Sequence, residues 1–202
     1  GAFPSQSGLF IKRDPKGKLL LAIYVDDLVV AGTAKDADAF FTELKTHIKI
    51  KEENGQVYRP AERFLGIQYR KFQDKQVRGY AMHLKEFATM FIEEFQAKCG
   101  NVRKGITSLP EIPIADERNT SGHEYRSPLA KLLWLARCTR PDIQLTINQL
   151  AAHVEFWGPE HTQALRHTVA YVQTTQTYEL ILQVHNSCKS DELSFAIWTD
   201  AN

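Results

Sequence analysis

The chain has 202 residues, of which 43% are hydrophobic and 24% are charged, and this composition is typical of a soluble globular protein. A net charge of +1 excludes a strong overall electrostatic footprint for nucleic acid, although a local basic groove is compatible with it. The three cysteines lie far apart in the sequence and form no CxxC pair, which argues against a disulfide framework or a zinc site. No apolar run reaches the ~18 residues of a membrane span.

The first half of the chain is predicted to form strands around one helix. "GLFIKR" and "KLLLAIY" are strand-like runs joined by a Pro/Gly turn. Residues 19–31 are predicted to form a hairpin with Val25 to Asp27 near its bend. From Lys35 onward apolar residues recur at helical spacing. "RFLGIQYRKF" and "VRGYAMHL" then predict another hairpin, which turns at "QDKQ".

The second half is predicted to be helical until near its end. "LKEFATMFIEEF" has an apolar helical face, and Gly100 is the expected stop. Residues 101–122 contain two prolines and few periodic apolar positions, so they form the predicted linker. Three helical segments follow, the first with Ser127 as N-cap and Pro128 at its first helical position, and the second beginning at Pro141. "YELILQV" and "ELSFAIWTD" predict two strands.

Asp26 and Asp27 are adjacent carboxylates inside an apolar run. Tight hairpins favour residues that adopt positive φ, and neither Val25 nor Leu28, which flank the pair, suits that conformation. A desolvated carboxylate without a partner is unfavourable, so the pair is predicted to be either solvated or bound to a cation. An ordinary solvated bend and a functional site are about equally compatible with this chemistry. For a functional site, hard oxygen ligands on a rigid bend suit Mg²⁺.

Several motifs together resemble one family. "YVDDL" between two apolar strands is similar to the catalytic motif of reverse transcriptases, and "RFLGIQYR" resembles the hairpin that grips the primer strand in that family. "YRSPLAKLLWLARCTRPDIQLTINQLA" closely resembles a block of copia-type retrotransposon polyproteins, and "PEHTQALRHTVAYVQTT" matches the helix after it. "WTDAN" is similar to the first strand of the tethered ribonuclease H domain. The matches follow the family's order along nearly the whole chain.

The resemblance implies an α+β fold that contains the C-terminal half of a polymerase palm, built from antiparallel hairpins with a helix. Residues 1–83 would form this palm part, 84–122 a thumb helix and linker, and 123–178 a helical connection. Residues 179–202 would be the first strands of a truncated ribonuclease H domain. The upstream palm and fingers, with a third metal-binding aspartate, and the downstream part of ribonuclease H are expected to lie outside this chain.

The implied activity is RNA-directed DNA synthesis by two-metal nucleotidyl transfer to a primer 3′-hydroxyl. Asp26 and Asp27 would be the catalytic ligands of Mg²⁺, and Asp200 would be a Mg²⁺ ligand of the ribonuclease H part. The implied nucleic-acid contacts are Tyr24, Phe64, Leu65 and Gly66. Expected partners are an RNA/DNA primer–template, deoxynucleoside triphosphates and the remaining polyprotein, with no membrane. This chain by itself is expected to be inactive, and the expected location is cytoplasmic, in a virus-like particle, or nuclear.

Other interpretations stay open. Tyr24 could be an ordinary strand aromatic residue, Phe64 and Leu65 could be core residues, and Asp200 could begin a loop. Arg140 and its neighbours match the family block closely but are expected to be structural. A non-catalytic remnant of a retrotransposon with weak nucleic-acid or subunit contacts is the alternative function, and an unrelated Mg²⁺ phosphohydrolase is a weaker one.

Overall fold

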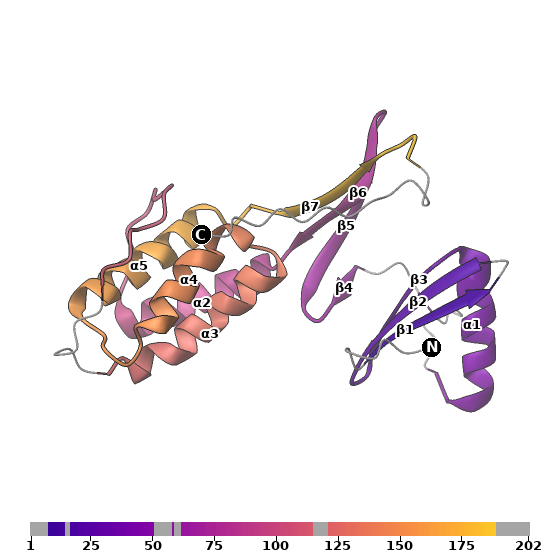
Figure 1. Cartoon of the computed structure of the whole chain (residues 1–202), viewed down its shortest axis with the longest axis horizontal. Helices are drawn as coiled ribbons and strands as arrows, with labels where there is room; N and C mark the ends of the chain where they lie inside the picture. The colour runs from indigo at the N-terminus through magenta and orange to yellow at the C-terminus, as the bar shows by residue number, and fades with distance from the viewer. Residues whose placement is uncertain (1–7, 15–16, 51–57, 59–61, 115–120, 189–202) are drawn as a thin grey trace. The chain divides into compact units, whose positions relative to one another are not determined.

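The computed structural model describes residues 8–14, 17–50, 58, 62–114 and 121–188 (Figure 1). The chain divides into two compact units, Gly1–Gly66 and Ile67–Asn202. Both the sheets and the helices of the described part agree with the predicted α+β class at this coarse level. The division falls at Gly66, whereas the first predicted boundary followed residue 83. The assignment of palm, thumb, connection and ribonuclease H to these segments stays a prediction.

The first unit contains an antiparallel sheet in the order β1-β2-β3, with β1 at Leu9–Asp14, β2 at Gly17–Tyr24 and β3 at Asp27–Ala31. Helix α1 (Ala34–His47) follows and contacts β2. The helix begins there because Thr33 is its N-cap, whose hydroxyl accepts a hydrogen bond of 3.2 Å from the backbone N–H of Asp36. No side chain of α1 is fully buried. The short strand β4 (Arg63–Phe64) comes near the end of the unit.

The sheet of the second unit joins β5 (Ile67–Gln73), β6 (Val77–His83) and β7 (Leu180–His185), all antiparallel. At the predicted turn, the Asp74 carboxylate accepts hydrogen bonds from the backbone of Val77 and Gln76, and these bonds lower its pKa. Gly79 permits the pairing with β7, since a Cβ at that position would lie 2.1 Å from the Leu182 carbonyl oxygen. β7 was predicted to be the first strand of a ribonuclease H sheet, but in this structure it pairs with β6. The second predicted strand of that segment lies outside the described residues.

Four helices enclose the core of the second unit. They are α2 (Lys85–Cys99), α3 (Arg126–Cys138), α4 (Gln144–Ala152) and α5 (Pro159–Thr174). The apolar face predicted for α2 is buried, and Gly100 ends that helix with φ 79°. Among the described residues, no helix is long and apolar enough to cross a lipid bilayer.

The starts of α3 and α4 differ from the prediction. A 3₁₀ turn at His123–Tyr125 precedes α3, so Tyr125 takes the N-cap position. Ser127 is therefore not the cap, and Pro128 is inside the first turn. Likewise, Pro141–Ile143 is a 3₁₀ turn that leads into α4. In both cases a 3₁₀ turn supplies the first hydrogen bonds that a capping side chain would otherwise make.

Residues 101–114 have no regular secondary structure, yet they are packed against the helices. Val102 is buried, Ile106, Leu109 and Ile112 are half-buried against the core, and Ile114 at the end of the segment is exposed. Side chains of α5 hydrogen-bond to its backbone carbonyl oxygens, with Arg166 on Asn101 (2.6 Å), His167 on Ser108 (3.0 Å) and His161 on Pro113 (3.2 Å). The described part of the predicted linker is thus fastened to α5.

Candidate functional site

The turn between β2 and β3 carries the predicted aspartates. Tyr24 pairs with Asp27 across the two strands, so Val25 and Asp26 form a two-residue turn. Val25 has φ 54°, which is a strained conformation for a β-branched residue. Val25 therefore takes part in a tight turn, and the prediction that it would not adopt positive φ was wrong. The cross-strand pairing of the hairpin imposes the turn, and Val25 adopts the strained conformation with its side chain 87% exposed.

Both carboxylates of the turn are accessible. Asp26 and Asp27 are exposed, and among the described residues neither carboxylate takes part in a hydrogen bond or an ion pair. Asp27 is the first residue of β3, whereas Asp26 lies in the turn. Strand alternation, which would send neighbouring side chains to opposite faces, therefore does not govern Asp26. The pair is solvated, and its oxygen atoms are available to a cation.

The residues of this turn fit Mg²⁺ only in part. Within the described ranges there is no group of three or more His, Cys, Asp or Glu side chains that could hold a metal ion. Mg²⁺ typically binds one or two carboxylates and completes its shell with water and substrate phosphates. Two adjacent, unpaired carboxylates meet that requirement. Asp200, the other predicted ligand, lies outside the described residues.

The predicted primer-contact residues form a second two-residue turn. β4 ends at Phe64 and β5 begins at Ile67, so Leu65 and Gly66 lie between them. Leu65 has φ 53° and Gly66 has φ 78°, and a type I′ hairpin turn needs positive φ at both positions. The prediction that Gly66 lies inside a strand was wrong. Its role in the fold is to supply positive φ.

The two candidate turns share one property. In the part of the chain that the structure describes, Val25 and Leu65 are the only non-glycine residues with positive φ. Each stands beside residues predicted to contact substrate. Non-glycine residues in this conformation cost free energy, and such strain concentrates at functional sites. Tyr24, 59% exposed, is the cross-strand neighbour of Asp27, and Phe64 is half-buried.

Arg140, which is expected from its motif to be structural, is 5% exposed. Its guanidinium donates to both carboxylate oxygens of Asp142 (2.9 and 2.7 Å) and to the Thr175 carbonyl oxygen (3.1 Å), and Tyr171 also donates to Asp142. Burial raises the pKa of Asp142, but the hydrogen bonds and charge of Arg140 outweigh it, so the net pKa is lowered. The geometry agrees with the structural role predicted for this motif.

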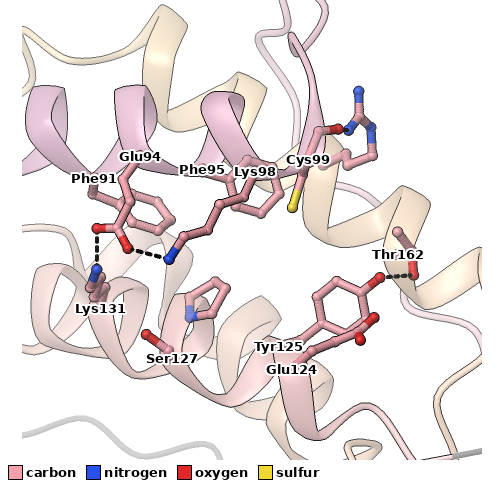
Figure 2. Close-up of a pocket in the computed structure, with 12 residues that line it drawn as sticks. Phe91, Glu94, Phe95, Lys98, Cys99, Glu124, Tyr125, Ser127, Lys131 and Thr162 are labelled. Atoms are coloured by element: carbon pink, nitrogen blue, oxygen red, sulfur yellow. Dashed lines mark hydrogen bonds and ion pairs between the residues drawn. The ribbon is translucent and has the colours of Figure 1, made fainter.

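Sequence reasoning missed a pocket of about 440 Å³ in the second unit (Figure 2). Its lining comes from α2, from the 3₁₀ turn at His123–Tyr125 with the start of α3, and from α5, which are distant in the sequence. The only local signal was the i, i+4 spacing of Glu94 and Lys98, which form an ion pair at 2.9 Å. That spacing is common on solvated helix faces, so it did not indicate a pocket.

Comparison with known proteins identifies the same family as the motifs. Residues 2–107 match the protein family described as reverse transcriptase (RNA-dependent DNA polymerase). The chain is 24% identical over 201 residues to the retrovirus-related Pol polyprotein from transposon RE1 of Arabidopsis thaliana, which covers 96% of this chain and 13% of that protein. No solved structure matches the chain.

Two further relatives are also transposon proteins. The chain is 22% identical over 212 residues to the transposon Ty5-1 protein of Saccharomyces cerevisiae, covering 98% of this chain and 61% of that protein. It is 22% identical over 166 residues to the retrovirus-related Pol polyprotein from transposon TNT 1-94 of Nicotiana tabacum, covering 78% of this chain and 12% of that protein. The chain thus spans less than two thirds of each relative.

Proposed function

Because the chain belongs to the reverse transcriptase (RNA-dependent DNA polymerase) family, we propose that it contributes catalytic carboxylates to a copia-type retrotransposon polymerase. The observation that carries this proposal is the β2–β3 turn, where Asp26 and Asp27 are exposed and unpaired among the described residues. The proposed reaction is RNA-directed DNA synthesis on an RNA/DNA primer–template from deoxynucleoside triphosphates. The activity and partners of the whole polyprotein are part of the proposal.

Asp26 and Asp27 are the residues that would hold the metal. When bound there, Mg²⁺ supplies the charge that activates a primer 3′-hydroxyl and stabilises the leaving pyrophosphate. The turn itself keeps both carboxylates at the end of one hairpin. Tyr24 offers an exposed ring beside Asp27 to the primer end or the incoming nucleotide. An upstream palm strand would supply the third aspartate.

The Leu65–Gly66 turn is the proposed contact with the primer backbone. Gly66 is exposed and has no side chain, so a phosphodiester backbone can approach the peptide closely there. Phe64 and Leu65, both half-buried, would hold the turn in position. Asp200 is the proposed Mg²⁺ ligand of the ribonuclease H part, which needs further acidic residues.

Metal binding can be tested on the chain as it is. Mn²⁺ prefers the same oxygen ligands as Mg²⁺ and broadens nearby NMR signals. We expect substoichiometric Mn²⁺ to broaden the amide signals of Asp26 and Asp27, and Mg²⁺ to reverse the effect. Asp26→Asn should weaken the broadening. Asp74→Asn, in an exposed turn of the second unit, is the matched control and should change nothing at Asp26. Equal broadening at both turns would contradict a specific site.

Primer extension tests the polymerase. The chain alone should not extend a primer, whereas the chain joined to the upstream palm and fingers of its polyprotein should do so with Mg²⁺. In that longer protein Asp26→Asn should reduce extension to background without lowering the unfolding temperature. A folded longer protein that never extends a primer would favour the non-catalytic remnant. With the downstream segment added, Asp200→Asn should stop cleavage of RNA in a hybrid while polymerisation continues.

A further inference from the structure

The pocket between α2, α3 and α5 has the size and lining of a small-molecule site. Its volume of about 440 Å³ lies within the range of about 300–1,000 Å³ that such sites occupy. Tyr125 and Pro128 are half-buried and offer flat apolar surface to it, and the buried rings of Phe91 and Phe95 lie behind its α2 side. Figure 2 shows the rings of Phe91 and Phe95 on the α2 side and Tyr125 on the other. Such a lining suits a planar ring.

Tyr125 is held in place from behind. Its ring stacks on Trp157 with centroids 4.7 Å apart, and its hydroxyl accepts a hydrogen bond of 3.2 Å from Thr162. Trp157 in turn donates to the Thr162 hydroxyl at 2.8 Å. This wall of the pocket therefore exists before any ligand arrives, and a ligand loses less free energy when it binds a preformed surface.

The polar rim of the pocket is cationic overall, with Lys98, Lys131 and Arg166 against Glu94 and Glu124. Glu94 accepts hydrogen bonds from Lys131 and Lys98, and these bonds lower its pKa to about 2, so it is ionised at neutral pH. The two lysines are thereby drawn toward the same carboxylate (Figure 2). An ammonium has three N–H donors, so both lysines retain donors for a second anion.

Arg166 adds a charge that no carboxylate balances within the described ranges. Its guanidinium donates to the backbone carbonyl oxygens of Cys99 and Asn101 at the end of α2. These two bonds orient the guanidinium and leave some of its five N–H donors unused. Arg166 therefore adds positive charge to the α5 side of the rim, whereas Lys98 and Lys131 lie together at Glu94 and form the pair of ammonium groups that can bind one phosphate.

We propose that this pocket binds a small molecule consisting of a planar aromatic ring that carries one phosphate group. The ring packs on Tyr125 and Pro128, and the phosphate accepts hydrogen bonds from Lys98 and Lys131. Every lining residue belongs to the second unit, so binding does not depend on Asp26 or Asp27. The inference therefore stands or fails separately from the proposed polymerase function.

The test uses 1-naphthyl phosphate and the full chain, with affinity and location read from NMR chemical shifts. We expect shifts around Tyr125 and weaker binding of inorganic phosphate and of 1-naphthol, since each has half of the required chemistry. Lys98→Gln should weaken binding by about fivefold, which corresponds to about 1 kcal/mol. Lys75→Gln, an exposed lysine in the β5–β6 turn, is the matched control and should leave the affinity unchanged.

Two further variants should change the affinity in opposite directions. Ser127→Phe should abolish binding by filling the pocket, whereas Glu94→Gln should strengthen binding because it releases both lysines. Circular dichroism and unfolding temperature show whether each variant is folded. A single-stranded DNA with a 5′-phosphate tests whether the pocket binds the end of a nucleic-acid strand instead of a free small molecule. Tighter binding of this DNA than of 1-naphthyl phosphate would overturn the proposal. Unchanged affinity in folded Ser127→Phe, or weaker binding in folded Glu94→Gln, would overturn it as well.

Discussion

The two compact units bury very different amounts of apolar surface. In the second unit α2, α3, α4 and α5 enclose a continuous core, with Leu132, Ile147 and Leu165 at 0% exposure. In the described part of the first unit Leu19 is the single buried hydrophobic residue, and α1 has none. The proposed catalytic carboxylates thus lie in the unit with little core of its own, while the unit with the large core carries the separate pocket.

The residues that stabilise the fold most and the proposed catalytic residues therefore lie in different units. Hydrophobic burial is the main favourable contribution to folding, so the second unit should unfold at higher denaturant than the first. Substitutions in the first unit should alter the proposed reaction with small effects on the second.

Ile147→Ala should lower the unfolding free energy of the second unit by about 2–5 kcal/mol, because a fully buried side chain leaves a cavity. The matched change in the first unit is Leu44→Ala, at a half-buried position of α1. Leu44→Ala should lower the unfolding free energy of the first unit by about 1 kcal/mol, since less buried apolar surface is lost. Urea unfolding followed by residue-resolved hydrogen exchange measures both. Equal losses would mean that the first unit is stabilised by as large a core.

Arg140→Met should lower the unfolding free energy of the second unit by about 1–3 kcal/mol, because Asp142 and the Thr175 carbonyl oxygen lose their hydrogen-bond donor. Arg137→Met, at an exposed position in the last turn of α3, is the control and should have little effect. Chemical denaturation of both variants measures their unfolding free energies. A neutral Arg140→Met would show that the buried network contributes no net stability.

The same pair predicts a pH dependence. The folded-state pKa of Asp142 lies below its unfolded value, so the stabilisation is present above about pH 4 and is lost as pH falls through the folded-state pKa. Asp142→Asn should remove this acid-sensitive part of the stability. Unfolding free energies of the wild type and Asp142→Asn, compared between neutral pH and pH 2, measure it. An equal loss of unfolding free energy in both proteins between neutral pH and pH 2 would show that Asp142 does not contribute to the acid sensitivity.

Thr33→Ala should destabilise the start of α1 by about 1 kcal/mol, because the Asp36 N–H loses its capping acceptor. Thr33→Asp keeps an acceptor and should retain most of the stability. Hydrogen exchange of the first-turn amides of α1 reports the change, and the amides of α5 serve as the internal reference. Faster exchange in α5 would mean that the two units do not unfold independently.

Val25→Gly should have the smallest effect on the unfolding free energy of the first unit. Unlike the other variants it should leave that free energy unchanged or raise it by up to about 1 kcal/mol. Glycine releases the positive-φ strain at Val25, and its greater freedom in the unfolded chain offsets part of that gain. Val29→Gly, inside β3, is the control and should lower stability. Hydrogen exchange of β2 and β3 measures both changes. A loss at Val25 as large as at Val29 would show that the turn is unstrained.

The sequence by itself determined most of the secondary structure. Strand-like runs and the turn between them predicted β5, β6 and β7, apolar residues at helical spacing predicted α1 and α2, and Gly100 correctly marked the end of α2. The motifs also identified the family, which the comparisons confirmed. These features depend on periods of two or 3.6 residues and on short local signals, all of which can be read along the chain.

Only the tertiary structure decided which residues meet. Cross-strand pairing places Val25 and Leu65 at positive φ, although their own preferences oppose it. Packing of helices distant in the sequence brings Lys131 to Glu94 and encloses the pocket. It also buries Arg140 and brings it to Asp142 and to Thr175, a contact across 35 residues that the local sequence does not specify. These outcomes depend on contacts between separate segments, and the free energy of such contacts exceeds the weak local preferences from which sequence predictions are made.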